Sequence, residues 1–162
     1  MQFSTVLVAA LTSALASAVP TAKISSSSCA VQYPTAVDFK AVDFPISLSL
    51  AKNAAVDITA DLSFEIPPAA VGPCSLVVEL PANYPILTSG DSQVNVKAVD
   101  GPAPGALVGT YTFVQSPDAI FVTIDSFACR PTFEFVLEIA GAEGALSLTE
   151  IEGAGIFMTY DC

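Results

Sequence analysis

Four cysteines are the residues with the most specific chemistry in this chain: Cys29, Cys74, Cys129 and Cys162. Their even number fits oxidised pairs, and zinc binding is a weak alternative because the chain has no CxxC spacing and no histidine. Of the three possible connectivities we favour Cys74–Cys129 and Cys29–Cys162. Cys74 opens an apolar strand, Cys129 lies between two strands, and the other two cysteines lie near the chain ends. The chain-entropy model gives each such long loop roughly 4–5 kcal/mol of stabilisation.

The absence of histidine limits the catalytic chemistry open to the chain. Ser-His-Asp and Cys-His machinery cannot be built, and neither can a His-ligated zinc or copper site. Paired carboxylates remain, because Glu134 and Glu138 share one face of a predicted strand, about 13 Å apart at ~3.3 Å per residue. That separation exceeds the roughly 5–9.5 Å used in glycoside hydrolysis. We therefore expect a solvated acidic face, no catalytic residues and a protein that is not an enzyme.

Four aspartates in predicted loops, Asp91, Asp100, Asp118 and Asp125, are candidate oxygen ligands for calcium. Calcium takes about six to eight oxygens, and no EF-hand-like spacing is present. Aspartates in turns more often accept hydrogen bonds from their own backbone. The expectation is therefore no metal site and no cofactor.

Three tyrosines, Tyr33, Tyr84 and Tyr111, are candidates for exposed aromatic platforms that bind sugars. Tyrosines that flank strands more often pack half-buried, with the hydroxyl group hydrogen-bonded. We expect packing as their main role and keep sugar binding as the alternative. The sequence identifies no ligand-binding residue beyond these candidates.

The chain is strongly acidic, with a formal net charge of −11 at pH 7 and a pI of about 4.1. A nucleic-acid binder needs clustered cations that displace counterions from phosphates. The basic residues of this chain are few and scattered: Lys23, Lys40, Lys52, Lys97 and Arg130. This pattern excludes nucleic acid and anionic membranes as partners.

Residues 1–18 have the features of a secretory signal peptide. Residues 6–15 form an apolar stretch of suitable length, and residues 16–18 supply small side chains at the cleavage site. The stretch is too short to span a bilayer, which takes about 20 apolar residues, and no later segment is apolar enough. We expect a secreted, extracellular protein without a membrane span. Residues 19–32 are then a short Ser-rich lead-in, and residues 33–162 a single domain.

The elements that must position these residues are β-strands, because apolar and polar residues alternate from about Tyr33 onward. In the clearest segment, every second residue from Val56 to Ile66 is apolar. The pattern predicts an all-β, antiparallel β-sandwich of about eight or nine strands, closed by disulfides, with a β-barrel as the alternative. The predicted strands lie within residues 44–50, 56–66, 74–80, 94–98, 108–114, 120–124, 133–139, 146–148 and 156–162.

From Cys74 onward the chain resembles the But-two C-terminal domain family, a group of fungal, mostly secreted β-proteins. The stretch between Val99 and Leu107 is short here, where relatives often carry a longer insert that contains Trp, and this chain has no Trp. The resemblance implies a fungal, secreted β-domain without catalytic residues. It rests on the segments CSLVVELP (74–81), SGDSQVNV (89–96), LVG (107–109), 124–129, FEFVLEIA (133–140) and GIFMTYDC (155–162).

These observations together predict a secreted, non-enzymatic fungal protein. It would be associated with the cell wall or extracellular matrix, or would act as an effector or elicitor. The partner is unknown, with a cell-wall polysaccharide or a host protein as candidates. One alternative is an acid-active carbohydrate hydrolase or a carbohydrate-binding module. Another is binding to an activating enzyme of a ubiquitin-like modifier, the role from which the family takes its name.

Overall fold

The computed structural model describes residues 29–38, 40–41 and 45–162, so the predicted signal peptide lies outside the described residues. The described part is all-β, and each predicted strand has a counterpart in it. The strands are β1 (Ala30–Gln32), β2 (Ala36–Val37), β3 (Lys40–Ala41), β4 (Ile46–Lys52), β5 (Asp57–Ile58), β6 (Ala60–Glu65), β7 (Pro73–Leu80), β8 (Ile86–Gly90), β9 (Gln93–Ala98), β10 (Leu107–Thr112), β11 (Ile120–Ala128), β12 (Thr132–Ile139), β13 (Gly144–Glu150) and β14 (Gly155–Tyr160).

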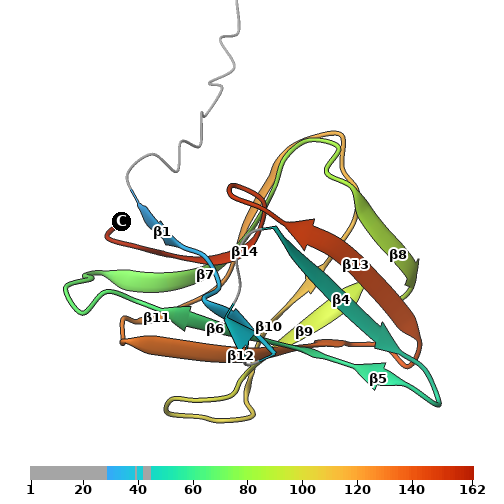
Figure 1. Ribbon diagram of the computed structural model, residues 1–162, viewed down its shortest axis with the longest axis horizontal. Coiled ribbons are helices and arrows are strands. Elements are labelled where there is room, and N and C mark those ends of the chain that lie inside the picture. The colour runs from blue at the N-terminus through green and yellow to red at the C-terminus, as the bar shows by residue number, and fades with distance from the viewer. Residues whose placement is uncertain (1–28, 39, 42–44) are drawn as a thin grey trace, which may run out of the picture.

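These strands form three antiparallel sheets. Sheet A has the order β1-β14-β7-β11, sheet B the order β10-β9-β12-β6-β2-β3, and sheet C the order β5-β4-β13-β8. Sheet A lies over sheet B on one side of the molecule, and sheet C is tilted away on the other (Figure 1). All three sheets are open, so the predicted sandwich is confirmed and the barrel alternative is wrong.

The core is built from the inward faces of all three sheets. Along β12, Phe133, Phe135 and Leu137 are each 1% exposed, while the residues between them are only half-buried. Leu62 and Phe64 of β6 are equally buried beside them. Each such side chain contributes about 1.5–3 kcal/mol through burial, so the period-two pattern sets which face of each strand turns inward.

The segment 56–66 is not one strand, as the sequence predicted, but two. β5 pairs with β4 in sheet C, whereas β6 pairs with β12 in sheet B. Only the second half keeps its apolar face inside, because Val56 and Ile58 are 41% and 48% exposed. In this segment one unbroken alternation covers two strands. The chain passes from sheet C to sheet B at Thr59, where the pairing partner changes from β4 to β12.

Two further expectations need correction. Residues 29–32, which the sequence assigned to the lead-in, are part of the packed structure, because β1 pairs with β14 over Ala30–Gln32 and Cys29 is cross-linked. The described residues also hold fourteen strands where eight or nine were predicted. The additional ones are β8 and the two- or three-residue strands β1, β2, β3 and β5, whose lengths are too short to show a periodic pattern.

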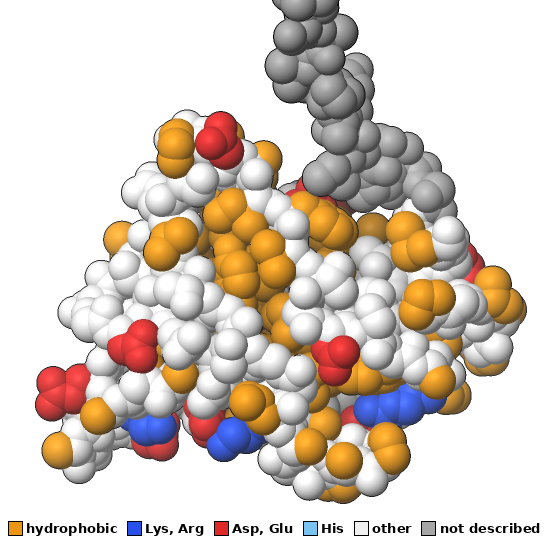
Figure 2. Space-filling model, turned by 180° about the vertical axis from the view of Figure 1, so that it is seen from behind, with side chains coloured by type: hydrophobic (Ala, Val, Ile, Leu, Met, Phe, Trp, Pro, Cys, Tyr) orange, Lys and Arg blue, Asp and Glu red, His pale blue; other side chains and the backbone are white. Residues whose placement is uncertain are grey.

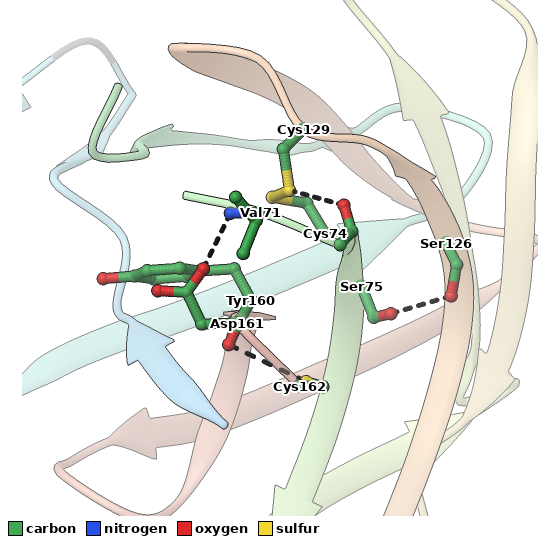
Figure 3. The surroundings of a disulfide bond; sticks show 9 residues. Val71, Cys74, Ser75, Ser126, Cys129, Tyr160, Asp161 and Cys162 are labelled. Atoms are coloured by element: carbon green, nitrogen blue, oxygen red, sulfur yellow. Dashed lines mark hydrogen bonds between the residues drawn. A yellow bond between two sulfur atoms is a disulfide. The ribbon is translucent and has the colours of Figure 1, made fainter. Parts of the chain in front are cut away.

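The two disulfides of the structure join Cys29 to Cys162 and Cys74 to Cys129, the pairing favoured from the sequence. The first connects the start of β1 to the end of β14, and the second connects β7 to the segment that leaves β11 (Figure 3). Both bridges therefore tie chain segments to sheet A. The described residues contain no helix with the length and apolar character needed to cross a membrane.

Candidate functional site

The site with the clearest binding geometry is a groove between β10 and β11, with a volume of about 420 Å³. These strands are the end strands of sheets B and A, so the groove lies where the edges of the two sheets meet. Its wall is mainly apolar and includes Leu107, Val108, Phe127 and Phe135. The volume lies within the range of about 300–1,000 Å³ typical of small-molecule sites. We call it the β10–β11 groove.

One end of the β10–β11 groove lies beside a close approach of its two strands. A Cβ atom on Gly109 would lie 2.7 Å from Cγ2 of Ile124, so only glycine permits this approach. Both strands carry a register shift here, between Leu107 and Gly109 in β10 and between Thr123 and Asp125 in β11. Bulges of this kind redirect neighbouring side chains, and Asp125 lines the groove.

The other end of the groove is formed by an ion pair between Asp100 and Arg130. Nη2 of Arg130 lies 2.5 Å from Oδ1 of Asp100, and Nη1 contacts Oδ2. The same Oδ1 accepts a hydrogen bond of 3.0 Å from the backbone N–H of Glu134. The guanidinium carbon lies 4.2 Å from the ring centroid of Phe133, within cation–π distance. Arg130 is therefore held from two sides, and its neighbour Cys129 is anchored by a disulfide.

The ion pair determines the charge state of Asp100. Burial alone would raise the pKa of this carboxyl group, but the hydrogen bonds from Arg130 and Glu134 and the charge of Arg130 lower it overall. Asp100 is therefore ionised at neutral pH and cannot serve as a general acid there. Its place at the groove makes it a positioning group for Arg130 and for the loop between β9 and β10.

The floor beneath the groove is an aromatic cluster. The ring of Phe127 lies 5.5 Å from that of Phe133 and 5.7 Å from that of Phe135, measured between centroids. Phe133 and Phe135 are 1% exposed, whereas Phe127 is half-buried and lines the groove. The cluster gives the groove a rigid apolar base and one aromatic surface that a ligand can contact.

Asp125 is the groove carboxylate that lacks an ion-pair partner. Its Oδ1 accepts a hydrogen bond of 2.8 Å from the backbone N–H of Ser126. The described residues form two ion pairs, Lys97–Glu138 and Arg130–Asp100, and neither includes Asp125. The charged groups of the groove lining are Asp100, Arg130 and Asp125, so their formal charges sum to −1.

The three candidate tyrosines do not form a common platform. The ring of Tyr33 packs 5.5 Å from that of Phe157 in sheet A, and its hydroxyl oxygen accepts a hydrogen bond from the N–H of Gly153. The Tyr84 hydroxyl donates to the carbonyl of Thr149 in sheet C. Tyr111 packs against Phe113 in an edge-to-face contact, with centroids 4.8 Å apart. Each ring thus packs against its own surroundings, as the sequence reasoning favoured.

Of the carboxylates considered for catalysis or calcium, Asp100 and Asp125 line the same groove, and Glu138 and Asp91 have partners elsewhere. Oε1 of Glu138 lies 2.7 Å from Nζ of Lys97, and this hydrogen bond is the main reason that the pKa of Glu138 is lowered. Asp91 accepts a hydrogen bond from the backbone N–H of Gln93, two residues along the chain, as expected for an aspartate in a turn. Within the part of the chain that the structure describes, no three Asp, Glu, Cys or His side chains gather as metal ligands.

The disulfide between Cys74 and Cys129 holds the segment after β11 in place against sheet A. Cys74 is completely buried, and Sγ of Cys129 lies 3.3 Å from the carbonyl oxygen of Gly72. Beyond this bridge, Asp161 accepts a hydrogen bond of 2.7 Å from the N–H of Val71, which fastens the end of β14 to the same region (Figure 3). The segment that carries Arg130 is therefore fixed relative to sheet A.

Sequence reasoning missed the groove and one buried acid. Asp100 and Arg130 are separated by 30 residues, and nothing in the local pattern joins them. Glu150 could have been noticed, because it continues the inward positions of Leu146 and Leu148 at period two, and it is 1% exposed. A charged residue on an apolar strand face is an informative exception to the alternation.

Seen from behind, hydrophobic side chains gather in a band down the middle of the molecule, and the Lys and Arg side chains in view lie along its lower margin (Figure 2). The exposed hydrophobic residues of β10 and β11 include Leu107, Phe121 and Val122.

In the comparisons with known proteins, no family model matches the chain, and no curated protein matches it significantly.

Proposed function

We propose that the protein is a secreted, non-enzymatic β-sandwich protein that acts by binding an apolar ligand in the β10–β11 groove. Its setting is the fungal cell wall or extracellular matrix, or it is an effector sensed by a host. The observation that carries the binding role is an apolar groove of about 420 Å³ between two sheet edges, with an ion pair at one end.

The side chains at the groove support binding and not catalysis. The chain has no histidine, and Asp100 is kept ionised by Arg130. Hydrolysis by two carboxyl groups needs one of them to hold a proton at working pH, which requires a raised pKa. The lowered pKa values of Asp100 and Glu138 are the opposite of what a general acid needs.

The extracellular setting is supported by three features. Residues 1–18 have the pattern of a secretory signal, and two disulfides are typical of oxidising compartments. The resemblance to the But-two C-terminal domain family adds the fungal origin. The intact mass of protein from culture medium tests this part of the proposal. We expect a chain that begins after residue 18 and is lighter by four hydrogens than its fully reduced form.

The binding role can be tested with the neutral fluorescent probe N-phenyl-1-naphthylamine. We expect Leu107→Asp to weaken its binding at least tenfold, because a carboxylate replaces the apolar groove wall. Ile58→Asp is the matched control, since Ile58 is similarly exposed but lies on β5. Equal binding by both variants and the wild type would show that the groove is not the binding site.

Two further assays address the setting. Sedimentation with insoluble glucan and chitin reports association with the cell wall, and infiltration into plant leaves reports recognition by a host. A response in one assay that is unchanged by Leu107→Asp would place that activity on another surface. Turnover of glucans, chitin or pectins at acidic pH would contradict the non-enzymatic proposal.

A further inference from the structure

We infer that the β10–β11 groove selects small amphiphilic cations, that is, ligands with an apolar body and one ammonium group. This inference rests on the proposed binding role and adds the charge of the ligand. Three observations support it: the size and apolar wall of the groove, the balance of its charged side chains, and the net negative charge of the whole chain.

The size and the wall of the groove set the apolar part of the ligand. About 420 Å³ accommodates a small molecule. Leu107, Val108 and Phe127 supply apolar contact, and the rigid pair Phe133 and Phe135 lies beneath Phe127. A ligand that fills this space gains about 0.8 kcal/mol for each CH₂ group that it removes from water.

The charges of the groove set the sign of the head group. Arg130 forms an ion pair with Asp100, which also accepts the backbone N–H of Glu134, so the positive charge of the guanidinium is already balanced within the groove. Asp125 lines the same cavity and is outside both ion pairs of the described residues. Because Asp125 uses Oδ1 for the N–H of Ser126, its other oxygen is the acceptor left for an ammonium group.

The charge of the whole chain acts in the same direction. A net charge of −11 attracts cations and repels fatty-acid anions during approach to the groove. It also disfavours a second copy of the chain as the occupant, because two molecules of the same sign repel one another. Salt screens this long-range contribution at physiological ionic strength, so the local contribution of Asp125 can be measured separately.

Three eight-carbon probes that differ only in the head group test the inference: octylammonium, octanol and octanoate. Their affinities are measured at pH 7 and 150 mM salt by displacement of N-phenyl-1-naphthylamine from the complete mature protein. We expect octylammonium to bind about fivefold more tightly than octanol, the scale of a half-exposed ion pair, and octanoate to bind most weakly.

The variant Asp125→Asn should remove the preference for octylammonium over octanol, and its side-chain oxygen can still accept the N–H of Ser126. Asp57→Asn is the matched control, since it removes the same charge from an exposed site on β5. The inference is overturned if octanol binds as tightly as octylammonium, or if Asp125→Asn keeps the preference.

The outcomes separate this inference from the proposal beneath it. Binding of octanol that depends on Leu107 but shows no preference for the cation overturns the selectivity and leaves the groove as a binding site. Failure of all three probes and of the fluorescent probe overturns both. A preference that disappears equally in Asp57→Asn attributes it to net charge, which also overturns the role of Asp125.

Discussion

The backbone N–H of Ile156 donates a hydrogen bond of 3.1 Å to Oε1 of Glu150, within the corner where β13 passes into β14. Glu150 is 1% exposed, and its second oxygen has no hydrogen-bond partner in the described part of the protein. Burial raises the pKa of Glu150 to about 8, and the hydrogen bond from Ile156 offsets only part of this effect. The side chain is therefore a protonated acid in the folded protein at acidic and neutral pH.

This pKa predicts that stability depends on pH. The folded protein holds the proton of Glu150 up to about pH 8, whereas the unfolded chain releases it near pH 4.5. The free energy of unfolding is therefore highest below pH 4.5. It falls as pH rises from 4.5 through 8, by a total on the order of 4–5 kcal/mol. Urea unfolding at pH 5, 7 and 9 measures it. Glu150→Gln should remove this loss, because a neutral amide replaces the acid.

Glu152→Gln is the control for that experiment, because Glu152 is exposed two residues further along the chain. It should keep the pH dependence of the wild type. If Glu150→Gln loses stability between pH 5 and pH 9 as steeply as the wild type does, the buried acid is not its cause.

The corner also predicts a strong effect of Gly155→Ala. Gly155 has φ 136°, and a Cβ atom there would lie 2.8 Å from Cγ of Glu150. Backbone strain and the clash together should lower the free energy of unfolding by roughly 2–4 kcal/mol. Gly153→Ala also has a positive φ, of 79°, but meets no atom within 4 Å, so it should cost only about 1–2 kcal/mol. Equal losses in thermal unfolding would contradict the role of the clash.

The ion pair between Asp100 and Arg130 predicts a pH dependence of stability opposite to that of Glu150. Because the pKa of Asp100 is lowered in the folded state, its stabilisation is present above its ordinary value of 3.8. It is lost as pH falls through the lowered value. Asp100→Asn should therefore reduce stability at pH 7 by roughly 1–3 kcal/mol, and the difference from the wild type should narrow at pH 2.5. Chemical denaturation at the two pH values would refute this if the difference stayed constant.

The two disulfides should be distinguishable in function. Their loops span 133 and 55 residues, and the chain-entropy model gives about 5 and 4 kcal/mol respectively. Replacing Cys74 and Cys129 by alanine should also weaken the binding of the fluorescent probe, because Cys129 anchors Arg130 at the groove. Replacing Cys29 and Cys162 should lower stability with little change in probe affinity. Equal loss of probe binding in both variants would contradict this assignment.

Much of the fold could be predicted from local patterns. Leu62 and Phe64, or Phe133 and Phe135, alternate with polar residues, and this alternation identifies a strand and its inward face wherever it occurs. It does not identify the pairing partner. The segment 56–66 shows the consequence, because one continuous pattern serves β5 in sheet C and β6 in sheet B.

The candidate site likewise has features that local patterns predict and features that depend on strand pairing. Acidity, the lack of histidine, the four cysteines and the alternating segments that become strands can all be seen in the sequence, because these properties belong to single residues or to near neighbours. The tertiary structure alone decided that Arg130 meets Asp100, that β10 and β11 enclose a groove, and that Glu150 is sealed in a corner. Each of these depends on which strands pair and which edges are left at the ends of the sheets. Those choices arise from contacts between distant residues, which a local pattern does not record.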